Sequence, residues 1–305
     1  MAYKTGDPLL LRKPIFLAAS KVITWFIELL GWPLMRFLYG FRIKGRENLK
    51  TAGIGLRRKG RKPHIVVSNH VLPLDPLLHG LSLLPRFTYF TLLEETVLTP
   101  VLGTFVRLLG GIPVPYAPGR LDDIEAAVGE GLRGRGLVHL YPEGECFLLS
   151  QEIAPFKAGA FYYAIKFGVP VLPIVTVIRS RAGRAAPPPD QGSGPVPRGA
   201  AAQTAVQTAA QAAPQTPTPD FLLGVSPGFS LGSSTAPRIL ASTHILPAVA
   251  PPPSSGRAAT DLHNAIIFSR TVRALMQACI EAEGGDKSLY RGPMPRIRGV
   301  NDRER

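Results

Sequence analysis

Short apolar runs recur through the middle of the chain and predict the strands of a sheet. The clearest runs are Ile65–Val67, Leu137–Leu140 and Val169–Val177. Segments with apolar residues at helical spacing alternate with them, at 76–84, 120–132 and 159–167. Strands that alternate with helices are typical of βαβ units. The pattern therefore predicts an α/β fold class with a mixed, largely parallel sheet flanked by helices.

Weaker patterns extend this core on both sides. Strands are expected at 41–45, 87–92 and 239–247, and helices at 94–109, interrupted near Pro100, and at 260–283. We expect one core domain at 41–178, completed by a C-terminal helix within 258–285. Segment 179–257 is dominated by Ala, Pro, Gly, Gln, Ser and Thr. Such a composition cannot bury enough apolar surface to offset the entropy of ordering. It predicts a mostly disordered insertion with a late strand near 238–249, and the tail at 286–305 is expected to be flexible and basic.

The first forty residues are too rich in large apolar side chains for an ordinary surface helix. Lys21, Glu28 and Arg36 interrupt the apolar run before about 20 clean residues accumulate, and Pro33 breaks it. We therefore expect 1–40 to form membrane-associating helices that lie in the headgroup region. The aromatic residues expected at the interface are Trp25, Trp32 and Tyr39. A tilted span and a helical hairpin packed on the domain remain as alternatives.

The charge of the chain narrows the class of partner. Lys+Arg number 35 against 21 Asp+Glu, which gives a formal net charge of +14. The basic residues flank apolar segments, with one cluster at 57–62. An anionic membrane surface, where each base is worth about 1 kcal/mol, fits this arrangement better than nucleic acid, because no basic reading helix is evident. The two cysteines, Cys146 and Cys279, form neither a zinc spacing nor a disulfide framework.

The residues best suited to chemistry follow the 65–67 strand. Ser68-Asn69-His70 ends that strand, and Asp75 precedes Pro76, where we expect it to be a helix N-cap. Pro73 disfavours a helix between His70 and Asp75, so the chain must turn and the carboxylate can return to the imidazole. A carboxylate on one ring nitrogen would leave the other nitrogen free as a general base. The plainer alternative is a capping aspartate beside a structural histidine.

Three motifs in the chain occur in a recognisable order. They are Asn69-His70-x4-Asp75, Tyr141-Pro142-Glu143-Gly144, and Val169-Pro170-Val171-Leu172-Pro173-Ile174. Their order and spacing resemble those of the glycerolipid acyltransferases, the family of 1-acylglycerol-3-phosphate acyltransferase. The resemblance runs from about Arg42 to Ile178 and resumes weakly near Ile239.

This resemblance implies acyl transfer from a thioester, on coenzyme A or acyl carrier protein, to a hydroxyl of a lysophospholipid acceptor. The most direct acceptor is 1-acylglycerol-3-phosphate, and no metal or cofactor beyond the acyl-CoA or acyl-ACP co-substrate is implied. His70 and Asp75 are then the catalytic residues. The implied substrate-binding residues are Asn69, Gly111, Glu143 and Gly144. The enzyme would be membrane-associated, at the cytoplasmic face of the cell membrane.

The chain departs from the family at two cationic positions. Relatives usually carry an arginine within a few residues of Gly111 that contacts the substrate's phosphate, whereas here the first candidate is the displaced Arg120. Relatives also commonly follow Gly144 with Thr-Arg, and this chain has Glu145-Cys146. Lys157, which precedes a small-residue helix start, is a second candidate to bind an anion. Another lysophospholipid or a non-phosphorylated lipid alcohol therefore stays open as the acceptor.

Three other functions compete with acyl transfer through His70. Cys146 is a candidate nucleophile activated by His70. A metal site is a second idea, although its residues match no familiar zinc spacing; they would be His64, His70, Asp75 and His79. A non-catalytic lipid-binding relative is the third, and the missing arginines motivate it.

Overall fold

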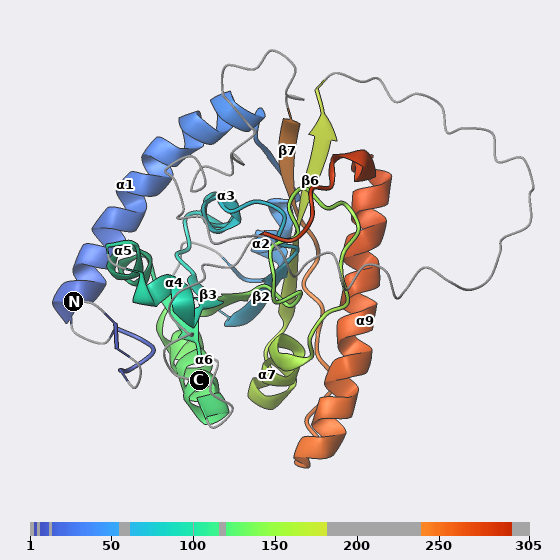
Figure 1. The fold of residues 1–305 in the computed structure, drawn as a ribbon. Helices are drawn as coiled ribbons and strands as arrows, with labels where there is room; N and C mark the ends of the chain where they lie inside the picture. The colour runs from blue at the N-terminus through green and yellow to red at the C-terminus, as the bar shows by residue number, and fades with distance from the viewer. Residues whose placement is uncertain are drawn as a thin grey trace, which may run out of the picture.

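A seven-stranded sheet forms the centre of the computed structural model, in the order β1-β7-β6-β2-β5-β3-β4 (Figure 1). The structure describes residues 3–4, 7–11, 14–54, 62–99, 101–115, 120–181 and 239–294. The strands are β1 Arg42–Lys44, β2 His64–Ser68, β3 Tyr89–Leu93, β4 Gly111–Val114, β5 Leu137–Leu140, β6 Val171–Ser180 and β7 Ile239–Ile245. Every neighbouring pair is parallel except β6 and β7, which are antiparallel. The predicted mixed, largely parallel sheet is confirmed.

The helices follow the predicted pattern with a few differences. They are α1 Pro14–Tyr39, α2 Glu47–Thr51, α3 Asp75–Leu83, α4 Glu94–Leu98, α5 Leu102–Leu108, α6 Leu121–Gly134, α7 Gly159–Phe167, α9 Ala258–Ala282 and the 3-10 helix η3 Lys287–Leu289. The sequence analysis missed α2, which is only 5 residues long, and β4, whose Pro113 is typical of a loop but is tolerated in an edge strand. Most of the 57–62 basic cluster and of the 179–257 insertion lies outside the described residues.

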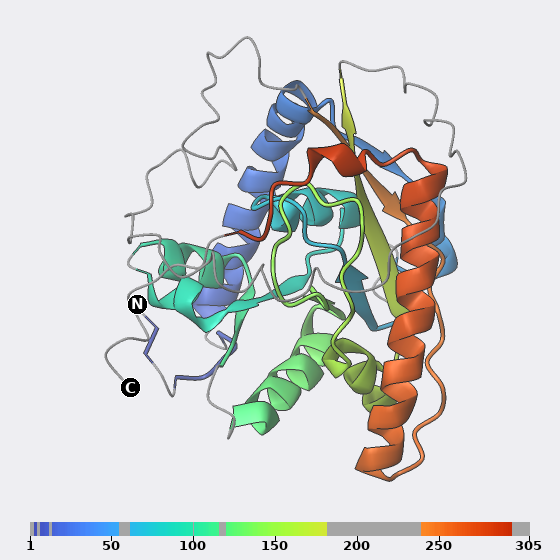
Figure 2. The ribbon, with the colours of Figure 1, turned by 45° about the vertical axis from the view of Figure 1, so that its right-hand side comes forward.

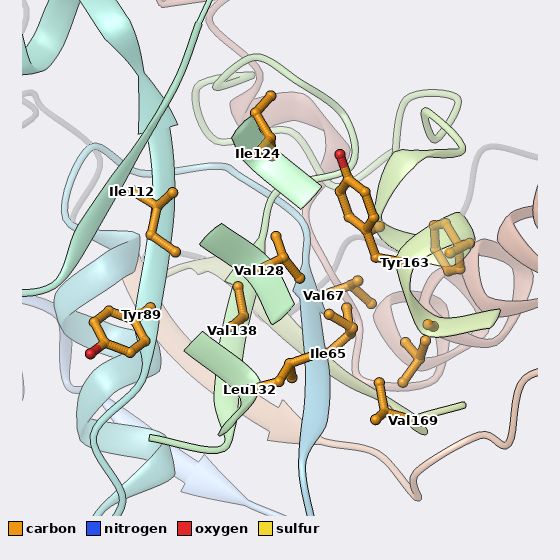
Figure 3. Packing of buried hydrophobic residues seen from close by; sticks show 14 of the residues in the cluster. Ile65, Val67, Tyr89, Ile112, Ile124, Val128, Leu132, Val138, Tyr163 and Val169 are labelled. Atoms are coloured by element: carbon orange, nitrogen blue, oxygen red, sulfur yellow. The ribbon is translucent and has the colours of Figure 1, made fainter. Parts of the chain in front are cut away.

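The core is built around β2, which is buried along its whole length. Ile65 and Val67 lie in one apolar cluster and Val66 in another, as expected when successive side chains point to opposite faces of a sheet. Figure 3 shows Ile65 and Val67 on the same side as Val128 of α6. Helices cover both faces of this parallel strand, which explains its continuous apolar run.

The N-terminal segment forms one helix, α1, and the prediction of a break at Pro33 is wrong. Pro33 lies inside α1. The turns on either side of it are held against the domain, because a side chain at Gly31 would collide with Leu77 of α3 and Met35 is 0% exposed. This packing compensates for the backbone hydrogen bond that proline removes.

Helix α1 lies along the flank of the domain opposite α9 (Figure 1). By length and composition Ile15–Tyr39 is apolar enough to cross a membrane, with a mean hydropathy of 1.5. Its charged Glu28 is nevertheless 5% exposed and faces Gly80 of α3. Its outward face is apolar, with exposed side chains at Ile15, Val22, Trp25, Phe26, Leu29, Leu30, Trp32, Leu34, Phe37 and Leu38. Helix α1 therefore reverses the usual arrangement of a surface helix: the Glu28 carboxyl faces the domain, and most of the large hydrophobic side chains face outward.

The residues that follow α9 pack on the domain as far as Met294, although the sequence predicted a flexible tail from Asp286. Leu289 of η3 is 4% exposed and lies in the same apolar cluster as Val71 and Leu72. Beyond η3, the Leu148 N–H donates to Gly292 O (2.9 Å) and the Met294 N–H to Cys146 O (2.7 Å). Figure 2 shows this segment, in red, running from α9 back toward α1. We call residues 286–294 the C-terminal strap.

Candidate active site

His70 and Asp75 meet in the turn between β2 and α3. His70 Nδ1 lies 3.0 Å from Asp75 Oδ2, and the side chains are 18% and 0% exposed. Because a carboxylate only accepts hydrogen bonds, Nδ1 carries the proton and Nε2 keeps its lone pair. Nε2 has no hydrogen-bond partner among the described residues. The geometry is that of a general base held by an aspartate.

Asp75 does not cap α3 in the way that the sequence predicted. It is the first residue of that helix, and its Oδ2 accepts hydrogen bonds from the N–H groups of Val71 (2.6 Å) and Leu72 (2.8 Å) as well as from His70. The carboxylate thus points back into the turn that Pro73 creates. Three donors on one oxygen offset the cost of burying its charge.

Glu143 joins the end of β5 to the same turn. Its Oε1 accepts a hydrogen bond from the His70 N–H and its Oε2 accepts one from the Ala154 N–H, both at 2.9 Å. The side chain is 5% exposed. Burial raises the pKa of Glu143 to about 7, while the two N–H donors act in the opposite direction. Because β2 and β5 are neighbouring parallel strands, their carboxyl ends meet at one edge, where open α/β sheets place ligands.

Of the two predicted cationic residues, Lys157 lies beside this turn. Gly144 has a φ of +77°. A side chain at Gly144 would collide with Lys157 Nζ, so the ammonium lies directly over the glycine. The Lys157 N–H also donates to Pro142 O at 2.8 Å. The exposed Lys157 therefore places a positive charge over Gly144, in the loop that follows β5.

Arg120 lies elsewhere, after the edge strand β4. That strand is three places from β2 in the sheet, roughly 14 Å at about 4.8 Å per step. The Arg120 Nε donates to Asp123 Oδ2 at 2.7 Å, and the Arg120 Nη1 lies 3.6 Å from Glu94 Oε1. Two carboxylates therefore already compensate the Arg120 charge.

Asn69 and Gly111 both occupy buried positions. The Asn69 Nδ2 donates to Thr176 O (2.9 Å) and its Oδ1 accepts from Thr176 N–H (2.8 Å), which ties the end of β2 to β6. Gly111 begins β4, and a Cβ there would come within 2.8 Å of Val106 O. Both residues hold the strands in place, and contact of either one with substrate stays a prediction.

The sequence analysis missed a supporting role for Tyr141 and His79. The Tyr141 ring stacks on the His70 ring, with centroids 4.2 Å apart and planes at 24°. Tyr141 Oη lies 3.2 Å from His79 Nδ1, and His79 Nε2 lies 2.9 Å from Thr176 Oγ1. The available signal was that His79, one helical turn after Asp75, shares its face of α3.

Ser68 and His139 complete this buried polar network. Ser68 Oγ lies 2.7 Å from His139 Nε2 and 3.2 Å from His79 Nδ1. Burial lowers the pKa of both histidines to about 3, so each is neutral near pH 7. Tyr141 directly follows β5, two residues after His139, and the two rings lie on the same face with centroids 4.8 Å apart.

The structure weighs against the two alternative chemistries. Cys146 is 5% exposed, and burial raises the pKa of its thiol, so the reactive thiolate is disfavoured. Within the described ranges no three His, Cys, Asp or Glu side chains are grouped to hold a metal ion. His64, one of the suggested ligands, instead contacts Lys62 O through Nδ1 at 3.1 Å.

The loop after Gly144 links the turn that carries His70 and Asp75 to the C-terminal strap. The Phe147 N–H donates to His70 O (2.8 Å) and the Leu149 N–H to Val71 O (2.9 Å). A cleft of about 250 Å³ lies between this loop and the strap. Its lining residues are Phe147, Ser150, Gln151, Glu152, Ala154, Lys287 and Tyr290.

Comparison with known proteins finds acyltransferases that align with the part of the chain that contains this site. Residues 40–177 match the family model described as Acyltransferase. The chain is 26% identical over 156 residues to a 1-acyl-sn-glycerol-3-phosphate acyltransferase of Saccharomyces cerevisiae, covering 50% of this chain and 48% of the yeast protein. It is 29% identical over 158 residues to the human 1-acyl-sn-glycerol-3-phosphate acyltransferase beta, covering 50% of this chain and 51% of that protein. The chain thus spans about half the length of these curated relatives.

A solved structure also aligns with this one. It is the crystal structure of the 1-acyl-sn-glycerophosphate (LPA) acyltransferase PlsC from Thermotoga maritima, at 18% identity and a TM-score of 0.46, over 88% of this chain and 85% of that chain.

The family match includes both segments that build the site. The Asn69-His70-x4-Asp75 turn and the Tyr141–Gly144 loop fall inside residues 40–177. Residues 40–177, a little under half of the chain, thus match the Acyltransferase family model, and the curated relatives that align with about half of the chain are glycerolipid acyltransferases.

Proposed function

We propose that this protein transfers an acyl group from an acyl-CoA or acyl-carrier-protein thioester to a hydroxyl of a membrane glycerolipid, most directly 1-acylglycerol-3-phosphate. The observation that carries the proposal is the His70–Asp75 pair at 3.0 Å, with Nε2 left without a protein partner in the described part of the chain. The names of the curated relatives support the same reaction and acceptor.

In this mechanism His70 Nε2 removes the acceptor's hydroxyl proton as the oxygen attacks the thioester carbonyl carbon. Asp75 keeps the proton on Nδ1 and stabilises the imidazolium that forms. The tetrahedral intermediate then expels the thiolate, which takes the proton back from Nε2. No covalent acyl-enzyme is needed, which agrees with the buried thiol of Cys146.

Glu143 acts as a positioning residue in this proposal. Both of its oxygens accept backbone N–H groups, so its ionised form holds the His70 backbone and the Ala154 loop together. A protonated carboxyl would turn a hydroxyl toward one of these donors and lose that contact, but the cost of burying the charged form is larger, so the pKa of Glu143 is raised.

The outward apolar face of α1 supports association with a membrane surface. Phe37 and Leu30 are 84% and 67% exposed. Such a face is costly in water and is stabilised when it enters the headgroup boundary of a bilayer. The net charge of +14 favours an anionic surface, such as the cytoplasmic face of the cell membrane.

A non-catalytic lipid-binding protein is the second candidate, favoured by the absence of arginine after Gly144. It predicts lipid binding without turnover, and the first experiment below separates the two.

Replacement of His70 by Ala should abolish thioester-dependent acyl transfer, because it removes Nε2, the atom that accepts the hydroxyl proton in this mechanism. Asp75→Asn should lower kcat by about 10²–10⁴, since it removes the charge that stabilises the imidazolium. The assay follows acyl-CoA and acyl-carrier-protein consumption by membranes containing each variant, with lysophosphatidic acid. Cys146→Ala serves as the control and should retain turnover. Equal rates in His70→Ala and the parent would contradict the mechanism, and no turnover in any combination would favour the lipid-binding protein.

The stability of the protein should fall as pH rises between about 4.5 and about 7, in part because of Glu143. Its pKa is raised on folding, so the stabilising contribution is present below the unfolded pKa and is lost as the buried carboxyl ionises. Glu143→Gln should remove up to roughly 3 kcal/mol of this dependence. Denaturant unfolding at pH 5 and pH 8 measures it, with Glu152→Gln at an exposed neighbour as the control. If the free energy of unfolding changes between pH 5 and pH 8 as much in Glu143→Gln as in the parent protein, Glu143 is not the source of this pH dependence.

Lys157→Ala should raise KM for lysophosphatidic acid by about tenfold and leave an uncharged monoacylglycerol little changed, because one charge-assisted contact is worth about 1.5 kcal/mol. Arg120→Ala should have a smaller effect, since Asp123 and Glu94 already compensate its charge. Parallel kinetics with the two acceptors test this. If only Arg120→Ala raises KM for lysophosphatidic acid, then Arg120 rather than Lys157 binds the phosphate. If the parent protein prefers the uncharged monoacylglycerol, the acceptor is a non-phosphorylated lipid.

The double variant Leu30→Ser, Phe37→Ser should bind vesicles containing anionic lipid at least about tenfold more weakly, because two large apolar groups no longer enter the bilayer. Its free energy of unfolding should change by less than about 1 kcal/mol, since both side chains are exposed. Ile267→Ser, at an exposed position on the opposite flank, is the matched control. Vesicle sedimentation measures binding. If the double variant binds vesicles as tightly as Ile267→Ser does, α1 is not the membrane contact.

A further inference from the structure

Three aromatic rings form a continuous column beneath the ring of His70, the proposed base. His70 stacks on Tyr141 at 4.2 Å and 24°, and Tyr141 stacks on His139 at 4.8 Å and 29°. Phe90 of β3 then lies 5.0 Å from His139. The column crosses from the end of β2 through β5 to β3, so three neighbouring strands fix it.

The titratable groups in and beside the column beneath His70 are neutral near pH 7. Burial lowers the pKa of His79 and His139 to about 3 and raises the pKa values of the Tyr141 phenol and the Cys146 thiol, which keeps all four neutral. The remaining charged groups that face His70 are the carboxyls of Asp75, from α3, and Glu143, from the β5 loop. On the side of the β5 loop, the exposed ammonium of Lys157 lies over Gly144.

We propose that Tyr141 is a positioning residue for His70 whose ring face also stabilises the imidazolium formed during acyl transfer. The role in turnover rests on the proposed function, whereas the stacking interaction itself does not.

The physical basis is the charge distribution of the ring. The face of a tyrosine ring is negative and attracts a cation within about 6 Å of its centroid. Asp75 meets the His70 ring in its plane, through Nδ1, and Tyr141 meets it from one face. The two contacts do not compete, and together they leave only the Nε2 edge and the opposite face for substrate.

The buried polar network holds Tyr141 in this orientation. Its hydroxyl lies 3.2 Å from His79 Nδ1, and His79 is held by Thr176 Oγ1 at 2.9 Å. This gives His79 and Thr176 a function that the acyl-transfer mechanism by itself does not use. The stack also restricts rotation of the His70 ring, which keeps Nε2 aimed outward.

The test compares Tyr141→Phe with Tyr141→Leu. In protein carrying ¹⁵N-labelled histidine, the His70 ring signals are assigned by their loss in His70→Ala, and their titration is followed by NMR. Without the stack the imidazolium loses a proton more readily, so Tyr141→Leu should move the titration midpoint down by about 0.5–1 pH unit. Tyr141→Phe keeps a ring face and should stay within about 0.3 unit of the parent.

A third variant keeps the shape of the ring and reverses the polarity of its face. Pentafluorophenylalanine at position 141 should lower the midpoint as Tyr141→Leu does while matching Tyr141→Phe in thermal unfolding. This variant decides the matter if Tyr141→Leu does not fold. A midpoint that is the same with phenylalanine and with its pentafluoro analogue would overturn the proposal.

Kinetics with acyl-CoA and lysophosphatidic acid then connect the stack to turnover. The acid limb of the kcat/KM profile should move to lower pH with the NMR midpoint, and kcat should fall by about tenfold in Tyr141→Leu. A midpoint that shifts while the acid limb stays fixed would overturn the role in turnover. Absence of thioester-dependent turnover in every variant, including the parent, would remove the proposed function, whereas the NMR comparison would still decide the stacking interaction.

Discussion

The site depends on one oxygen atom, Asp75 Oδ2, which receives three hydrogen bonds from within a turn of six residues. The donors are His70 Nδ1 and the N–H groups of Val71 and Leu72. This convergence fixes the path of the backbone, the tautomer of the imidazole and the direction of Nε2 at the same time. Since the carboxylate is fully buried, loss of any donor leaves its charge less compensated.

Glu143 supplies the second constraint, and it acts on the backbone of the same residue. Its two oxygens connect the His70 N–H to the Ala154 N–H, and the neighbouring loop connects His70 O and Val71 O to Phe147 and Leu149. The C-terminal strap then pairs with that loop. The turn that carries His70 and Asp75 is therefore held on both sides by segments far away in sequence. Burial of the Glu143 carboxyl in this position costs free energy, and its raised pKa is the sign of that cost.

Several of these features followed from the sequence because they depend on local rules. A strand that ends in His70, a proline that forces a turn, and a parallel neighbour that ends in Glu143 predicted the sheet edge and the meeting of His70 with Asp75. The direction of the Asp75 carboxylate did not follow, because an aspartate before a proline is equally compatible with a helix cap. The continuity of α1 through Pro33 and the docking of 286–294 depend on tertiary packing, at Gly31, Met35 and Leu289, that no local pattern records. The Tyr141 stack was missed for the same reason, since His79 and Thr176 hold it from different elements.

The packing of α1 connects the apolar surface of the protein to the chemistry. Met35 of α1 shares an apolar cluster with Val71 and Leu72, the two residues whose N–H groups bind Asp75. Helix α3, which begins at Asp75, lies between α1 and the sheet (Figure 1). A lipid that meets the outward face of α1 is thus separated from the His70 turn by one layer of helix and one apolar cluster. If the acceptor is a membrane lipid, the packing of Met35 on Val71 and Leu72 connects the helix that would meet the bilayer to the turn that holds His70.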